Sequence, residues 1–124
     1  MSPVRFRRSL GFALAGVRLA WREQRNFRIE VVIAVAVLLL AWWTSATIAP
    51  ILMMTGLVLA FELTNSAVEA LVDLVQPEHH ALAAAAKDLS AGAVLVAALA
   101  ALAVGVVVIG PPLLRKLQLG LGGG

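Results

Sequence analysis

One segment of this chain places charged and amide side chains at helical spacing within an apolar surrounding. A nearly unbroken apolar run, 51–61, leads directly into it. At about 100° per residue, five polar side chains share a sector of about 100° on a helix. They are Glu62, Asn65, Ser66, Glu69 and Asp73. An ionised group at the centre of a bilayer costs roughly 2.5–3.5 kcal/mol, so several such groups on one membrane helix indicate a site.

A lysine–aspartate pair, Lys87 and Asp88, lies at the start of the next apolar segment. The dipeptide Gln76–Pro77 predicts a turn between the two segments, because proline cannot continue the preceding helix. In a helical hairpin, residues equidistant from the turn lie at similar depth. Lys87 and Asp88 should therefore lie level with Asn65, and the spacing predicts a site formed by two helices.

Three kinds of function fit this group of side chains. Paired carboxylates with an amide and a lysine suit the binding of Mg²⁺ and phosphate. The same groups suit proton coupling in a small membrane transporter. They also suit a polar seam that holds neighbouring helices together. The residues and their spacing leave all three possibilities open.

The composition is that of an integral membrane protein. The chain has 124 residues, of which 61% are hydrophobic and 14% charged, whereas a soluble domain is about 45–50% apolar and about 25% charged. It has no cysteine, which excludes disulfides, thiolate metal sites and a thiol nucleophile. The net charge is +3. In a chain this hydrophobic, the net positive charge favours anionic lipid headgroups over nucleic acid as the partner.

Three apolar segments must position the polar side chains, and each can cross about 30 Å of hydrocarbon with its flanking residues. They run over about 29–43, 48–75 and 89–109. Pro77 and Glu78 suit the start of the third helix. Pro111–Pro112 should end it, because proline lacks the backbone donor that a helix interior needs.

The predicted fold class is an all-α membrane protein, with an N-terminal amphipathic surface helix followed by three transmembrane helices. The divisions are residues 1–28 for the surface helix and basic arm, 29–112 for the three-span domain, and 113–124 for a flexible tail. Apolar residues recur in the arm at three- and four-residue steps: Phe6, Leu10, Ala13, Leu14, Val17 and Trp21. Most of the cations precede the first span, which predicts a cytoplasmic N-terminus.

Two blocks of sequence resemble the signature of the small prokaryotic diacylglycerol kinase and undecaprenol kinase family. The first is 62–73, from Glu62 to Asp73; the second contains His80 and the run 86–95 around Lys87–Asp88. The stretch 21–30, which contains Arg25-Asn-Phe-Arg-Ile-Glu, is similar to that family's entry to its first span. The resemblance covers about residues 5–109, and the length and spacing of the two blocks make it specific.

The resemblance implies a multi-pass homotrimer in the bacterial inner membrane that phosphorylates a lipid alcohol with MgATP. It implies that Glu62 is the general base, that Glu69 binds Mg²⁺ and that Asn65 orients groups in the site. Nucleotide contacts are implied for Lys87 and Asp88 on the third span, for the stretch Glu78, His79 and His80, and for Arg5 and Phe12 on the surface helix.

One departure from the family pattern concerns a metal ligand. The family has a metal-binding glutamate three residues after the aromatic at Trp21, and this chain has Gln24 there, preceded by Glu23. An amide oxygen can bind Mg²⁺ without contributing charge. If the surface helix continues, Gln24 points along its apolar stripe and Glu23 points about 100° away.

Undecaprenol is the expected substrate. The run that begins at Lys87 and the end of the third span, Gly105 to Leu113, look more like the undecaprenol kinase branch. Diacylglycerol is the alternative lipid. The alternative from another class, a small proton-coupled transporter, would not need Lys87 and Asp88 and would work without nucleotide.

Overall fold

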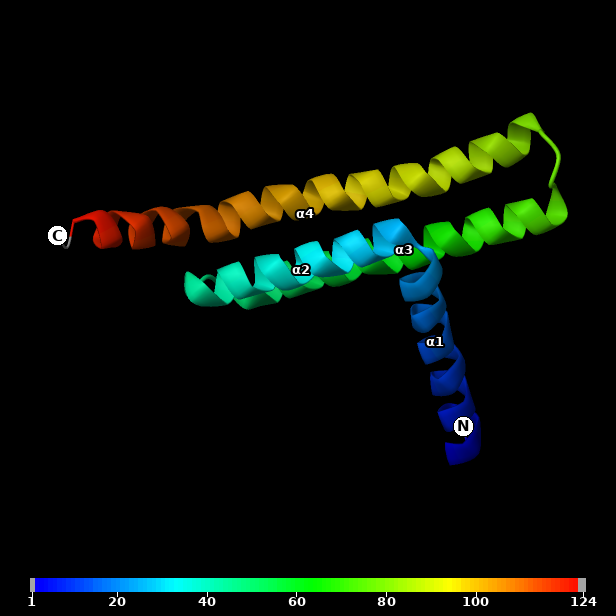
Figure 1. The fold of residues 1–124 in the computed structure, drawn as a ribbon, viewed down its shortest axis with the longest axis horizontal. Coiled ribbons are helices and arrows are strands. Elements are labelled where there is room, and N and C mark those ends of the chain that lie inside the picture. Colours follow the sequence, from blue (N-terminus) through cyan, green and yellow to red (C-terminus); the bar gives the residue numbers. More distant parts are fainter. Residues whose placement is uncertain (1, 123–124) are drawn as a thin grey trace.

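The computed structural model describes residues 2–122, which form four helices. These are α1 (Pro3–Glu23), α2 (Arg25–Trp43), α3 (Ile48–Val75) and α4 (Ala81–Leu121). The last three are long and apolar enough to cross a membrane. They lie alongside one another, whereas α1 projects steeply from the bundle (Figure 1). The predicted fold class, an N-terminal helix followed by three transmembrane helices, is confirmed.

The break between α1 and α2 occurs at Gln24, whose backbone is extended at φ −104° and ψ 104°. Arg28 stabilises this break, because its guanidinium donates hydrogen bonds to the carbonyl oxygens of Trp21 at 2.9 Å and Arg22 at 3.0 Å. These carbonyls belong to the last turn of α1 and lack helical partners. The surface helix therefore does not continue through Gln24, and the side-chain directions that a continuous helix implied do not apply.

The turn between α2 and α3 is a compact helix cap. Ser45 takes a left-handed conformation with φ 59°. Its amide donates to the carbonyl of Trp42 and the amide of Ala46 donates to that of Ala41, the bonds of a Schellman motif. The buried Thr44 hydroxyl donates to Leu40 at 2.8 Å. The predicted turn at 44–47 is confirmed.

The helix of the third span begins after its predicted start at Pro77 and Glu78, and it ends after its predicted end at Pro111–Pro112. Pro77 and Glu78 lie in the turn before α4, so the prediction that they start the helix is wrong. His80 begins α4 instead, because its Nδ1 accepts a hydrogen bond from the amide of Leu82 at 3.1 Å. A side-chain acceptor at this position satisfies one of the free amides of the first turn.

The prediction that Pro111–Pro112 ends the last helix is also wrong, because α4 contains both prolines and runs to Leu121. Proline fixes φ near the helical value, so it removes hydrogen bonds without forcing the chain to leave the helix. Leu113 packs against the core cluster, and Lys116 lies 4.5 Å from the ring centroid of Trp43. Predicted flexibility at residues 123–124 lies outside the described residues.

The helices of one chain bury few side chains. The core cluster is Ala41, Ile51 and Ile109, one residue from each membrane-spanning helix. It lies near the α2–α3 turn, which α4 passes before its C-terminal part extends beyond the other helices (Figure 1). Since α4 has 41 residues, it rises about 62 Å, twice the thickness of the hydrocarbon layer. The polar residues of α3 lie toward the opposite end of the bundle.

Candidate functional site

Glu62 is the buried acid of the polar face on α3. Its side chain is only 7% exposed. The negative charges of Glu30 on α2 and Glu69 on α3 both act on it. The carboxylates of Glu30, Glu62 and Glu69, from two helices, are therefore close to one another. A charged side chain on an isolated membrane helix is energetically unfavourable. The predicted polar face is thus extended by Glu30, an acid at the start of the first span.

Asn65 connects the two helices of the predicted site. Its amide nitrogen donates to Oε1 of Glu69 at 3.3 Å, and its amide oxygen accepts a hydrogen bond from the Ser90 hydroxyl at 2.6 Å. Asn65 therefore fixes the position of the Glu69 carboxylate relative to α4. Ser90 was not among the predicted site residues, although its three-residue spacing from Lys87 places both on one face of a helix.

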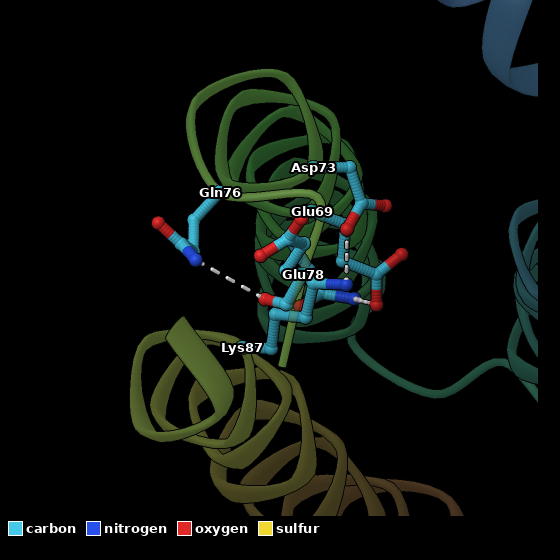
Figure 2. A network of polar contacts seen from close by, with 6 residues as sticks. Glu69, Asp73, Gln76, Glu78 and Lys87 are labelled. Atoms are coloured by element: carbon cyan, nitrogen blue, oxygen red, sulfur yellow. Dashed lines mark hydrogen bonds and ion pairs between the residues drawn. The ribbon is translucent and has the colours of Figure 1, made fainter. Parts of the chain in front are cut away.

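Lys87 crosses from α4 to α3 and forms an ion pair with Asp73, with 2.5 Å between Nζ and Oδ1. Figure 2 shows its side chain reaching Asp73 beside Glu69. The prediction that Lys87 faces the polar side of α3 is confirmed. Its partner, Asp73, lies nearer the turn between α3 and α4 than Asn65, which was predicted to lie level with Lys87. The side chains of Lys87 and Asp73 are 38% and 63% exposed, so a charged ligand can reach this pair.

The turn that follows α3 carries three further predicted residues. Glu78, His79 and His80 are all exposed. The side-chain amide of Gln76 donates a hydrogen bond to the backbone carbonyl of Glu78 at 3.4 Å (Figure 2). His80 is used as the cap of α4. Asp88, beside Lys87, is exposed and lies at the same end of the bundle.

The residues predicted on α1 divide into two groups. Arg5 and Phe12 are exposed on α1, the helix that projects from the bundle (Figure 1). Gln24 and Glu23 line a groove of about 510 Å³ between α1 and α3, together with Ser66. Ser66 is three residues, about one helical turn, from Glu69.

The oxygen donors near Glu69 are few. Within residues 2–122, no group of three or more acidic or histidine side chains is arranged to hold a metal ion. Mg²⁺ in sites that bind phosphates is held by one or two carboxylates, while substrate oxygens and water complete its shell. Glu69 with the amide oxygen of Gln24, or the carboxylate of Glu23, fits that donor chemistry.

Comparison with known proteins gives consistent results. The family model described as prokaryotic diacylglycerol kinase matches residues 11–109. A diacylglycerol kinase of Synechocystis sp. is 44% identical over 110 residues, which cover 86% of this chain and 63% of that protein. The chain therefore spans less than two thirds of that relative's length. A diacylglycerol kinase of Escherichia coli is 36% identical, with 76% of this chain and 80% of that protein covered. An undecaprenol kinase of Bacillus subtilis is 37% identical, with coverages of 88% and 91%.

Proposed function

The chain belongs to the prokaryotic diacylglycerol kinase family, and from that premise we propose that it is a lipid kinase that transfers the terminal phosphoryl group of ATP to undecaprenol. The observation that carries the proposal is the two-helix site. In it, Lys87 of α4 reaches the carboxylate-bearing face of α3, one turn from Glu69 and toward the buried Glu62. The residues of this site, Glu62, Glu69 and Lys87, lie within residues 11–109, the region that the family model matches.

Glu62 is the proposed general base. It takes the proton of the lipid hydroxyl as that oxygen attacks the γ-phosphorus, the bond from phosphorus to the bridging oxygen breaks, and ADP leaves. Its burial excludes water, which would compete with the lipid as acceptor. Lys87 neutralises charge on the phosphate oxygens, and Asn65 holds Glu69 in place. Proposed nucleotide contacts are Asp88, Glu78, His79 and His80.

Mg²⁺ is the proposed metal, held by Glu69 and by Gln24 or Glu23. Oε1 of Glu69 accepts its hydrogen bond from Asn65, and no protein donor within residues 2–122 contacts its second oxygen. When bound, Mg²⁺ would neutralise negative charge on the nucleotide phosphates. Glu23 and Gln24 provide oxygen donors on the α1 side of the groove, and Ser66 on its α3 side lies one helical turn from Glu69.

The proposed assembly is a homotrimer in the bacterial inner membrane with a cytoplasmic N-terminus. Seven of the ten cations lie before residue 29, where the first apolar run begins, which favours this orientation. Arg5 and Phe12 belong to α1, which projects away from the three long helices within one chain. They contact the nucleotide only if α1 moves toward α3 or if a neighbouring protomer provides them, and a trimer offers the second route.

The choice of lipid is tested by a side-by-side assay of purified protein with MgATP and either undecaprenol or diacylglycerol. The match to the Bacillus subtilis undecaprenol kinase extends over 91% of that protein, which supports undecaprenol. The names of the Synechocystis and Escherichia coli relatives favour diacylglycerol as the second candidate. We expect a higher kcat/KM for undecaprenol. Faster transfer to diacylglycerol would reverse the preference, and transfer to neither lipid would overturn the kinase proposal.

The Gln24→Glu variant should reach half-maximal activity at a lower Mg²⁺ concentration, by about three- to tenfold, because the added carboxylate contributes charge to the metal site. The same variant should show a larger rise in thermal unfolding temperature on addition of Mg²⁺ with a nonhydrolysable ATP analogue. Glu23→Gln is the matched control and should change neither quantity. The reverse result, with only Glu23→Gln changing the Mg²⁺ response, would assign the ligand to Glu23.

A further inference from the structure

The C-terminal part of α4 extends beyond the α2–α3 turn, at the end of the bundle opposite Glu69 and Lys87 (Figure 1). It continues past residue 109, where the match to the family model ends. Two adjacent cations, Arg115 and Lys116, belong to this part of the helix. The proposed phosphoryl-transfer site uses neither of them, so their role must come from their own surroundings.

Lys116 joins α4 to the end of α2. Its Nζ donates a hydrogen bond to the carbonyl oxygen of Trp43 at 2.5 Å and lies 4.5 Å from the centroid of the Trp43 ring. Trp43 is the last residue of α2, so its carbonyl lacks a partner within the helix, and a cation is favoured at this negative end of the helix dipole. An ammonium group has three donors. Lys116 therefore keeps donors for a second acceptor beside Trp43.

Arg115 is an exposed cation, and within residues 2–122 its side chain forms no hydrogen bond or ion pair. The sequence near it offers no acidic partner. Residues 31–61 contain no charged side chain, and Arg115 and Lys116 are the only charged side chains after Asp88. The end of the bundle at the α2–α3 turn thus carries two positive side chains and no negative one. Its electrostatic complement is an anion.

The distance along α4 places Arg115 at the level of lipid headgroups. Asp88 and Arg115 are 27 residues apart on this helix, a rise of about 40 Å. A bilayer measures about 40–45 Å when its headgroup layers are included. With Asp88 at one membrane surface, Arg115 lies in the headgroup layer of the other. The exposed side chains of Trp42 and Trp43 agree with this level, because tryptophan is enriched at membrane–water interfaces.

We propose that Arg115 and Lys116, beside Trp43, bind the phosphate group of an anionic phospholipid in the leaflet opposite the phosphoryl-transfer site. A guanidinium matches two phosphate oxygens at once, and the ammonium adds a second positive charge. The Trp43 ring provides an apolar surface where the headgroup meets the acyl chains. The ligand is part of the surrounding membrane, so the site needs no enclosed pocket. The inference is independent of which lipid alcohol the enzyme phosphorylates.

The test measures which lipid lies beside Trp43 in the full-length protein. A Trp21→Phe/Trp42→Phe variant leaves Trp43 as the only tryptophan. It is placed in bilayers of phosphatidylcholine and phosphatidylglycerol in equal amounts, in which bromine on the acyl chains of one lipid or the other quenches nearby tryptophan fluorescence. We expect phosphatidylglycerol to be favoured beside Trp43 by about fivefold or more, the factor that about 1 kcal/mol per surface cation gives.

Substitutions in the same single-tryptophan protein identify the contacts. Arg115→Gln and Lys116→Met should each lower the preference about twofold or more, and Arg115→Lys should retain most of it. Arg115→Gln decides the question, because it breaks no contact within residues 2–122 and should leave the thermal unfolding temperature unchanged. The matched control keeps Trp21 as the only tryptophan. There Arg115→Gln should not change the quenching, because Trp21 lies on α1.

Three results would overturn the proposal. Equal quenching of Trp43 by the two brominated lipids would show that this end of the bundle does not select an anionic lipid. An unchanged preference in Arg115→Gln would show that the selectivity arises elsewhere. Loss of the preference when inorganic phosphate replaces chloride at constant ionic strength would assign the two cations to a soluble phosphate, whereas its persistence would support the lipid.

Discussion

Replacement of Glu62 by glutamine should lower kcat for lipid phosphorylation by about a hundredfold to ten-thousandfold, the range that general-base catalysis contributes. The amide has nearly the same shape as the carboxylate but cannot accept the proton of the lipid hydroxyl. It also removes a buried negative charge on which Glu30 and Glu69 act. We therefore expect the thermal unfolding temperature to stay the same or rise, since an unfavourable charge is lost.

The opposite signs of these two effects make the experiment decisive. A core residue that only supports packing would lose activity together with stability, whereas a base loses activity alone. Glu62→Asp is the matched control, because it keeps a carboxylate and should retain more activity than the glutamine variant. KM for ATP should be unchanged in both. A glutamine variant within about tenfold of wild-type kcat would remove Glu62 from the role of base.

The position of the site could be predicted because it depends on two regular geometries. The helical period places Glu62, Asn65 and Glu69 on one face, and the hairpin turn near Gln76 fixes which part of α4 lies opposite. The confirmed contact between Lys87 and α3 follows from both. Ser90 was missed as a site residue because its role depends on contact with another helix, where it donates to the amide oxygen of Asn65.

The helix boundaries that were predicted incorrectly depend on tertiary contacts. Pro111 and Pro112 favour a helix end locally, but Leu113 and Lys116 find packing partners if the helix continues. At Gln24, by contrast, a helix ends although no proline or glycine predicts an end there. It is stabilised by the guanidinium of Arg28, which comes from the following helix. Neither boundary follows from local propensity alone.

Replacement of Lys87 by methionine should lower kcat/KM for ATP by about a hundredfold to a thousandfold, the usual loss when one donor to a developing oxyanion is removed. Methionine keeps the length of the side chain and removes its charge. The ion pair with Asp73 is solvent-exposed, with side-chain exposures of 38% and 63%. Its loss should cost only about 0–1 kcal/mol of unfolding free energy. The measurement is steady-state kinetics with varied ATP, alongside thermal unfolding.

Asp73→Asn separates the two possible tasks of Lys87, because it removes the partner of the ion pair and keeps the ammonium group. If the ammonium acts on the phosphates, Asp73→Asn should change KM for ATP only a few-fold and leave kcat near wild type. Lys87→Met should then lower kcat and raise KM for ATP. If the ion pair only joins α3 to α4, the two variants should lose activity equally and in step with stability. That equality would restrict Lys87 to a structural role, whereas partial activity of Lys87→Arg would agree with a requirement for positive charge at this position.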